Sequence, residues 1–406
     1  MSKKPLDLVD VDKVVNTTRE MVRIPSQYIE DELAQHAETA EYLANEMERI
    51  GLDVDVKEEA EGYPVVSGIT PGGEEGPVIG VIGHYSTVAI GEEDKWTRDP
   101  LGAEMEGNRI YGRGSCDQKG GIAAVLHAAE CLMKSDLPRK GRLRLLMVPG
   151  EGCTRMALEP VKEKWPEVLK CDAYLDSDGG PGAITLVYGG WIWLELLVRG
   201  RGGHAGSLTT GEDELLINPV ERLLDVLNDV RDPEWMEYEK HPLFNREHGR
   251  RTDKPIVDIT VLRAGSKVNI VPTQASALVD IRLLPSQLIE PVLEELDALL
   301  DELRDKDDTL DVSYRILNTS KNPREVSPDD PMIQAIKEVY CAEGLEEPEL
   351  TGSIGGGRGT LSVFGPVMSF GAGGGRNAHA PDEYTTVEAL ERGARMHARI
   401  YGKLLT

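Results

Sequence analysis

The residues best suited to chemistry are one histidine and one aspartate, each in a short and distinctive sequence. His84 occurs in Val-Ile-Gly-His-Tyr-Ser-Thr-Val, and Asp117 occurs in Tyr-Gly-Arg-Gly-Ser-Cys-Asp-Gln-Lys-Gly-Gly. Each follows an apolar run that is typical of a buried strand. Imidazole and carboxylate groups delivered from neighbouring strand ends are the ligands that a zinc or manganese site requires. A third candidate, His379, lies in Arg-Asn-Ala-His-Ala-Pro-Asp-Glu near the other end of the chain.

Together these sequences resemble the M20 family of metal-dependent peptidases and amidohydrolases. The usual pattern of that family is Gly-His-x-Asp, then Gly-Arg-Gly-x-x-Asp-x-Lys-Gly, then Glu-Glu, then a late Ala-His. The resemblance extends over nearly the whole chain. It implies that His84, Asp117 and His379 bind metal, with Asp117 between two ions. It also implies an acidic terminal ligand in Asp-Ser-Asp-Gly-Gly, for which Asp178 is the match and Asp176 the alternative.

Two positions depart from the family pattern. Ser86 stands where the family has an aspartate that hydrogen-bonds the other ring nitrogen of the metal-binding histidine, so we expect His84 to have a weaker, neutral partner. Glu151 stands where the family has two adjacent glutamates, a general base followed by a ligand. Counting from the preceding strand end makes Glu151 the base and Gly152 a missing ligand. The other register makes Glu151 the ligand and removes the base, and Cys153 is a further candidate as a soft ligand.

These departures leave the two metal sites of the family unequal. His84 and Asp178 complete one site with Asp117, whereas the second site has only Asp117 and His379. Two protein ligands hold a transition metal poorly. We therefore expect one tightly bound divalent ion per subunit, which is zinc, manganese or cobalt, and at most a weak second ion.

The resemblance also assigns residues to the substrate. His204, in Gly-Gly-His-Ala-Gly, is expected to reach the active site of a partner subunit and stabilise the oxyanion, which implies a homodimer. Asn269 and Arg282 match family positions on the smaller domain, although a structural role is equally open for both. Arg358 and Arg376 lie on glycine-containing loops, and either is suited to clamp a substrate carboxylate through two hydrogen bonds.

The elements that must position these residues follow an alternating α/β pattern. Continuous apolar strands are typical of a mainly parallel sheet that is covered on both faces, and such folds place ligands in the loops at the strand ends. Helices are predicted within 11–50 and at 121–133, and strands at 52–57, 77–83, 142–148, 173–175 and 367–371.

The order of elements changes in the middle of the chain, where it becomes β-α-β-β-α-β, the ferredoxin-like arrangement. We therefore predict an α/β sandwich of the zinc-peptidase type with an inserted α+β dimerisation or lid domain. The catalytic domain would comprise 1–187 and 319–406, and the inserted domain 188–318. The strands of the insertion are predicted at 191–199, 256–263, 275–283 and 310–316, and its helices at 219–230 and 288–304.

Composition excludes several classes of function. The length of 406 residues favours two domains, and a hydrophobic content of 40% supports a core. A net charge of −26 disfavours nucleic-acid binding. No apolar run approaches the ~20 residues that span a bilayer, and the N-terminus has no apolar signal core. The five scattered cysteines do not resemble a disulfide framework, so we expect a cytoplasmic protein.

The sequence thus indicates a metal-dependent hydrolase that cleaves a carbon–nitrogen bond of a small, carboxylate-bearing peptide or N-acyl amino acid, with metal-activated water and Glu151 as general base. Two alternatives remain open. One is a single-metal aminohydrolase that removes an aromatic amine, as the family's 5-nitroanthranilate aminohydrolase does. The other is a non-catalytic binding protein on the same fold.

Overall fold

The computed structural model describes residues 3–29, 36–73, 75–150, 153–211, 214–244, 253–355 and 359–406. The chain divides into two compact units. The first comprises Met1–Leu186, Val326–Leu350 and Arg358–Thr406, and the second comprises Val187–Glu325 and Thr351–Gly357. The second unit is therefore inserted into the first, as the order of elements predicts. The domain roles assigned above stay predictions.

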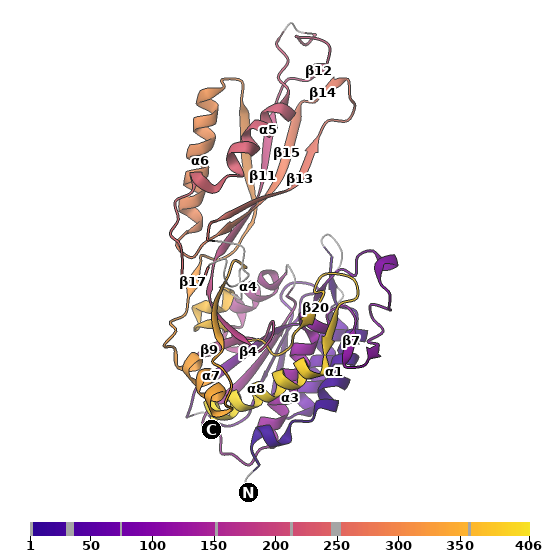
Figure 1. Cartoon of the computed structure of the whole chain (residues 1–406), viewed down its shortest axis with the longest axis vertical. Coiled ribbons are helices and arrows are strands. Elements are labelled where there is room, and N and C mark those ends of the chain that lie inside the picture. Colours follow the sequence, from indigo (N-terminus) through magenta and orange to yellow (C-terminus); the bar gives the residue numbers. More distant parts are fainter. Residues whose placement is uncertain are drawn as a thin grey trace. The chain divides into compact units, whose positions relative to one another are not determined.

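The first unit is built on a mixed sheet in which the strands follow the order β10-β19-β9-β4-β8-β3-β2 (Figure 1). Its middle strands β19, β9, β4 and β8 are parallel to one another, and the outer strands pair antiparallel. The parallel strands include the continuous apolar runs of the sequence, which confirms the predicted fold class. The strands are β2 (Asp53–Lys57), β3 (Val65–Ile69), β4 (Val78–His84), β8 (Arg142–Val148), β9 (Ala173–Asp176), β10 (Ala183–Tyr188) and β19 (Val367–Ser369).

Helices cover both faces of this sheet. A side chain at Gly83 of β4 would meet Ile122 of α3, whereas the neighbouring Ile82 packs in one apolar cluster with Leu158 of α4. Successive strand residues point to opposite faces, so α3 and α4 lie on opposite sides. Helix α3 also packs against α1 and α8. The helices of this unit are α1 (Val11–Arg23), α2 (Ala37–Arg49), α3 (Gly120–Lys134), α4 (Thr154–Lys164), α7 (Pro331–Ala342) and α8 (Val387–Leu405).

Two small sheets lie outside the central one, and the larger of them joins segments that are far apart in the sequence. It has the strand order β20-β21-β7-β6. It therefore places the segment around His379 beside the segment that leads to Asp117. These strands are β6 (Met105–Glu106), β7 (Arg109–Tyr111), β20 (Gly375–Arg376) and β21 (Tyr384–Thr386), and the smaller sheet pairs β1 (Gln27–Tyr28) with β5 (Thr87–Val88).

The second unit has the ferredoxin-like order that the sequence predicts. Its four-stranded antiparallel sheet runs β13-β15-β11-β16. Alternate residues of β11, such as Leu194 and Leu196, are buried with apolar residues of both helices. The elements are β11 (Gly190–Arg199), α5 (Pro219–Val230), β13 (Ile256–Ala264), β15 (Gln274–Leu283), α6 (Ile289–Lys306) and β16 (Asp311–Thr319), with a separate pair β12 (Gly203–His204) and β14 (Ile270–Val271).

Within the described part of the chain, every helix is too short or too polar to cross a membrane.

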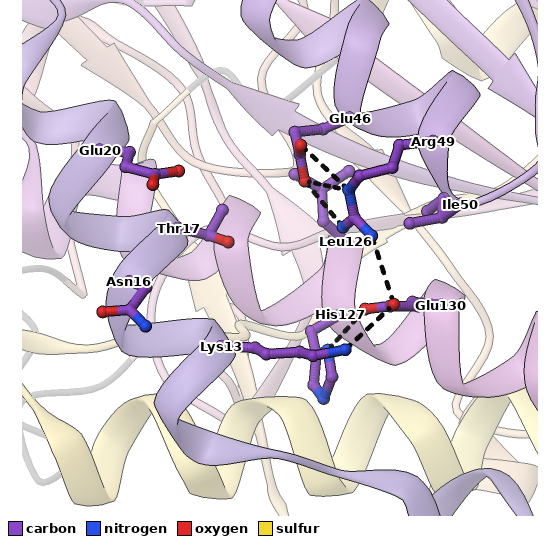
Figure 2. A pocket seen from close by; sticks show the side chains of 10 residues that line it. All are labelled: Lys13, Asn16, Thr17, Glu20, Glu46, Arg49, Ile50, Leu126, His127 and Glu130. Atoms are coloured by element: carbon purple, nitrogen blue, oxygen red, sulfur yellow. Dashed lines mark hydrogen bonds and ion pairs between the residues drawn. The ribbon is translucent and has the colours of Figure 1, made fainter.

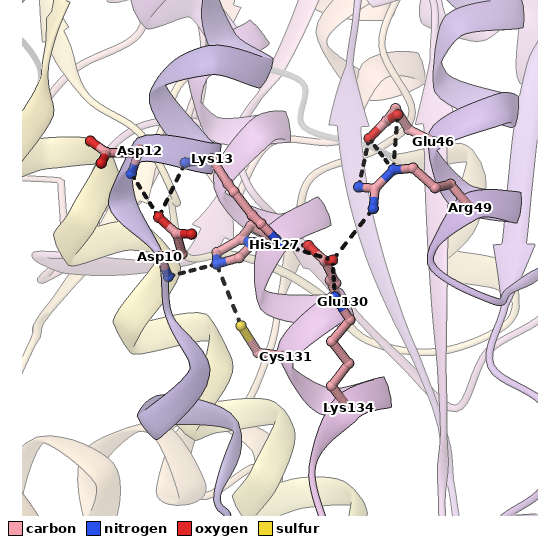
Figure 3. A network of polar contacts seen from close by, with 9 residues as sticks. All are labelled: Asp10, Asp12, Lys13, Glu46, Arg49, His127, Glu130, Cys131 and Lys134. Atoms are coloured by element: carbon pink, nitrogen blue, oxygen red, sulfur yellow. Dashed lines mark hydrogen bonds and ion pairs between the residues drawn. The ribbon is translucent and has the colours of Figure 1, made fainter.

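A buried carboxylate ties three helices of the first unit together. Oε1 of Glu130 on α3 lies 3.3 Å from Nζ of Lys13 on α1 and 3.4 Å from a guanidinium nitrogen of Arg49 on α2, and it also pairs with Lys134 (Figure 3). Its Oε2 lies 3.1 Å from Nδ1 of His127. Nε2 of His127 accepts the main-chain N–H of Asp10, so Nδ1 carries the proton and donates it to Glu130.

A pocket between α1, α2 and α3 opens onto this cluster (Figure 2). In this pocket Arg49 pairs with both Glu46 and Glu130, and Lys13 also pairs with Glu130. Burial raises the pKa of Glu130, but the hydrogen bond from Lys134 and the charges of Lys13 and Arg49 outweigh burial and lower it from 4.5 to about 2. The cluster therefore stabilises the helix layer as long as Glu130 is ionised.

We expect Glu130→Gln to lower the free energy of unfolding at pH 7 by about 1.5–3 kcal/mol, the range for hydrogen bonds to charged groups. A carboxyl group whose pKa is lower in the folded state stabilises the fold at pH values above its pKa in the unfolded chain. For Glu130 this stabilisation is lost as the pH falls from 4.5 towards 2. Urea unfolding between pH 7 and pH 3 should show that the free energy of unfolding decreases less with falling pH in the variant than in the wild type. An acid slope equal to that of the wild type would contradict this, and Glu163→Gln on the exposed side of α4 is the control.

Candidate metal centre

His84 ends β4, at the edge of the sheet where the parallel strands place their carboxyl ends. Its side chain is 2% exposed. Nδ1 lies 3.0 Å from the main-chain carbonyl of Ser86, which can only accept, so Nδ1 carries the proton and Nε2 presents a lone pair. The sequence suggested the Ser86 hydroxyl as this partner. The structure instead gives the hydroxyl to the N–H of Gly150, at 2.7 Å, and uses the carbonyl for the ring.

Gly150 explains how a second strand end reaches the histidine. A Cβ atom at this position would lie 1.9 Å from Cβ of His84, so no larger residue fits. The backbone after β8 therefore passes directly against the ring-bearing carbon of His84. Residues 151 and 152, which follow Gly150 in the sequence, lie outside the described part of the chain.

Asp117 lies between two histidines. It belongs to the irregular turn Ser115–Lys119 before α3, and its peptide bond to Gln118 is cis. Oδ1 lies 3.0 Å from Nε2 of His84, and Oδ2 lies 3.0 Å from Nε2 of His379.

The contact between Asp117 and His84 is suited to a cation. Among the described residues, Oδ1 of Asp117 is buried and accepts no hydrogen bond with good geometry. Since the Nδ1 proton of His84 goes to Ser86, Nε2 faces Oδ1 with a lone pair. Two electron-pair donors 3.0 Å apart with no proton between them repel each other unless a positive ion lies beside both. The donor set therefore fits a divalent metal.

Asp178 completes this group. Its Oδ2 lies 3.9 Å from Nε2 of His84, and ligand atoms of His84, Asp117 and Asp178 all lie within 4.8 Å of one another. Asp178 follows β9, which pairs in parallel with β4, so both strands deliver a ligand to the same edge. Asp176, the alternative from the sequence, is buried at the end of β9 and is not in this group of described residues.

The loop that carries His379 approaches through glycine residues. A Cβ at Gly371 would lie 2.0 Å from the carbonyl carbon of Gly179, and a Cβ at Gly375 would lie 2.5 Å from Cβ of Cys116. His379 itself has a positive φ of 64° and a half-exposed side chain. The glycine-rich segment therefore allows the backbone of this loop to lie directly against neighbouring segments.

A buried glutamate that the sequence analysis did not single out holds the Asp117 turn. Oε1 of Glu383 accepts the main-chain N–H groups of Cys116 and Asp117 at 3.1 and 3.2 Å, and Oε2 pairs with Arg113 at 2.6 Å. Glu383 lies four residues after His379, so it connects the histidine loop to the aspartate turn. Its signal in the sequence was a carboxylate inside the quoted Ala-His-Ala-Pro-Asp-Glu segment.

Lys119 braces the same turn. Its ammonium group donates to the carbonyls of Met21 and Ile24, at 3.0 and 2.7 Å, where α1 ends. Burial lowers the pKa of Lys119 to about 7. Arg113 and Lys119 are both buried and therefore support the Asp117 turn.

The other predicted residues are distributed between the two units. Arg376 of the first unit is exposed on β20, and Arg358 lies outside the described residues. In the second unit, His204 on β12 is exposed and accepts the N–H of Gly206, at 3.0 Å. Asn269 is exposed, and Arg282 on β15 binds Oδ2 of its neighbour Asp280.

Cys153, the proposed soft ligand, lies beside the candidate site. Its buried Sγ is 4.0 Å from the hydroxyl of Ser86, and it is not a member of the group formed by His84, Asp117 and Asp178. All five cysteines are free thiols.

Known proteins are similar to this chain in sequence and in fold. The model of peptidase family M20/M25/M40 matches residues 80–403. A succinyl-diaminopimelate desuccinylase of Thioalkalivibrio sulfidiphilus is 27% identical over 352 residues, which are 82% of this chain and 85% of that protein. An M20 family metallo-carboxypeptidase from Sulfolobus solfataricus has a TM-score of 0.73 at 23% identity, over 97% of this chain and 99% of that one. A tripeptidase from Staphylococcus aureus has a TM-score of 0.74 at 17% identity, over 97% and 98%.

The chain therefore belongs to peptidase family M20/M25/M40. It is a hydrolase that acts on the carbon–nitrogen bond of amides or peptides. The resemblance drawn from the histidine and aspartate sequences is confirmed.

We expect Glu383→Gln to lower the free energy of unfolding by about 3–5 kcal/mol, because it leaves the guanidinium of Arg113 buried without a counter-charge. Both side chains are at most 2% exposed. Urea unfolding of the metal-free protein measures the change. Glu106→Gln, which breaks the exposed pair with Arg98, is the matched control and should have a much smaller effect. Equal effects of the two substitutions would show that Glu383 does not support the Asp117 turn.

Proposed function

We propose that this hydrolase cleaves the amide or peptide bond of a small, carboxylate-bearing substrate, with a divalent metal held by His84, Asp117 and Asp178. The observation that carries the proposal is the pair of acceptors, Oδ1 of Asp117 and Nε2 of His84, that face each other at 3.0 Å. A metal held by these residues would supply Lewis acidity, which would polarise a carbonyl and lower the pKa of water so that its nucleophilic hydroxide form is available near neutral pH.

Glu151 is the general base of this proposal. It follows Gly150, which packs against His84, and the next residue is a glycine that cannot bind metal. Because Gly152 replaces the second glutamate, only the site formed by His84, Asp117 and Asp178 has three protein ligands. In this proposal that site holds one ion tightly. His379 adds one further ligand beside Asp117, which suits at most a weak second ion.

The substrate carboxylate needs a cation, and Arg376 is the candidate from the first unit, since it is exposed on the short strand beside Cys116. From the second unit we propose His204, Asn269 and Arg282, on the resemblance to the family alone. Peptides and N-acyl amino acids fit this set because both end in a carboxylate that an arginine can bind through two hydrogen bonds.

An aromatic amine is the second candidate for the cleaved group. It is favoured by the neutral partner of His84, a carbonyl of Ser86, and by Gly152, because both features distinguish this site from the usual two-metal pattern. A substrate panel that contains dipeptides, N-succinyl and N-acetyl amino acids, and aminobenzoates separates the two.

We expect Glu151→Gln to lower kcat by about 10²–10⁴-fold, the usual contribution of a general base, while the metal content stays near one ion per chain. The panel above, assayed with zinc-, manganese- and cobalt-loaded protein, gives kcat, and elemental analysis gives the metal content. Glu163→Gln on α4 is the control.

Loss of metal from Glu151→Gln would assign this residue as a ligand instead of the base. A wild-type protein that binds no metal under any loading condition would favour the non-catalytic alternative. Two tightly bound ions would overturn the single-metal proposal.

We also propose a cytoplasmic homodimer in which His204 completes the active site of the partner subunit. The free cysteines fit a reducing compartment. We expect a mixture of inactive Glu151→Gln and inactive His204→Ala subunits to recover activity after subunit exchange. One site of each mixed dimer then carries both defects, and the other carries neither, so up to half of its sites can work.

Native mass spectrometry of the mixture measures whether mixed dimers form. If mixed dimers form and no activity returns, His204 acts within its own chain or has no catalytic role. A protein that is monomeric at the assay concentration would contradict the proposed homodimer.

A further inference from the structure

The side chain of Gln118 connects the segments that carry the three candidate ligands. It follows Asp117 directly and is 1% exposed. Its Oε1 accepts the main-chain N–H of His84 at 2.7 Å, and its Nε2 donates to the hydroxyl of Ser177 at 3.4 Å. Ser177 is the residue before Asp178. One amide group therefore contacts the backbone of one ligand and the neighbour of another.

The contact with His84 lies where the pairing of β4 with β9 ends. Strands β4 and β9 pair in parallel only as far as Ile82 and Asp176, and the last main-chain bond runs from the N–H of Ser177 to the carbonyl of Ile82, at 2.8 Å. The pairing of β4 with β9 ends at this point, and the N–H of His84 donates to Oε1 of Gln118. Since a buried N–H without an acceptor is costly, Oε1 of Gln118 extends the hydrogen-bond ladder by one residue.

The contact with Ser177 requires an amide in particular. The hydroxyl of Ser177 donates its proton to the carbonyl of Ile82 at 2.7 Å, so it can only accept from residue 118. An amide both accepts from His84 and donates to Ser177. A carboxylate would satisfy the first contact and oppose the second, and a thioether would satisfy neither.

We propose that Gln118 is a positioning residue that fixes the separation between His84 and Asp178 and so sets the affinity of the site for a divalent metal. This inference rests on the proposed metal-binding function. Metal ligands must be held to within about half an ångström, and loss of a group that orients them typically weakens metal affinity by about 10–100-fold. The end of the pairing between β4 and β9 is where the ligands need this support.

The test is a metal titration of the metal-free protein. Zinc affinity is measured by competition with a chromophoric chelator, and the absorption spectrum of the cobalt-loaded protein reports the coordination geometry. We expect Gln118→Met to raise the Kd by about 10-fold or more and to change the cobalt spectrum. Gln118→Glu, which keeps the acceptor for His84, should raise the Kd less.

The matched control is Gln287→Met in the second unit. Gln287 is also buried, and its amide accepts the N–H of Leu284 at 2.9 Å and donates to the carbonyl of Glu237 at 3.1 Å. Both Met variants should lower the urea midpoint, because each removes two buried hydrogen bonds. Only the Gln118 variant should change the Kd and the cobalt spectrum.

A Kd within twofold of the wild-type value in folded Gln118→Met would overturn the inference and leave the proposed function intact. A wild-type protein that binds no metal would instead refute the proposed function. If Gln118→Met does not fold, Ser177→Ala tests the same connection. It removes the acceptor of Nε2 and should raise the Kd several-fold, and an unchanged Kd would overturn the inference.

Discussion

The carboxylate of Asp117 lies against two histidine rings, and the packing around the site depends on keeping both contacts. His84 comes from the end of a central strand and His379 from a loop near the other end of the chain. Bringing both rings to within 3.0 Å requires backbones to touch where side chains would ordinarily separate them. Gly150 and Gly371 provide these contacts, since a Cβ at either position would lie at most 2.0 Å from a neighbouring carbon.

Charged groups position Asp117, whereas neutral groups position His84. Asp117 is held by a charged pair, Glu383 with Arg113, which fixes the turn through two main-chain N–H groups. His84 is held by neutral groups, the carbonyl of Ser86 at the ring and the amide of Gln118 at the main chain. Among the described residues, the negative charge beside His84 therefore comes from Asp117 and Asp178.

The sequence predicted the fold because its strands and helices have different apolar periods, and the inserted unit is visible as a change in element order. It also predicted that the candidate ligands His84 and Asp178 lie close together, because strand ends meet wherever parallel strands pair. It did not predict Glu383 or the hydrogen bonds of Gln118. Both act through backbone groups of residues distant in sequence, and no local pattern reports which carbonyl or N–H lacks a partner.

The place of the insertion has a consequence for the order in which the chain can fold during synthesis. The first unit cannot complete its central sheet until β19 has been made, because this strand pairs with β9 nearly two hundred residues earlier. The second unit draws all four strands of its sheet from residues 190–319. Since domains generally fold as units while the ribosome is still adding residues, the inserted unit has its full set of strands before its host does.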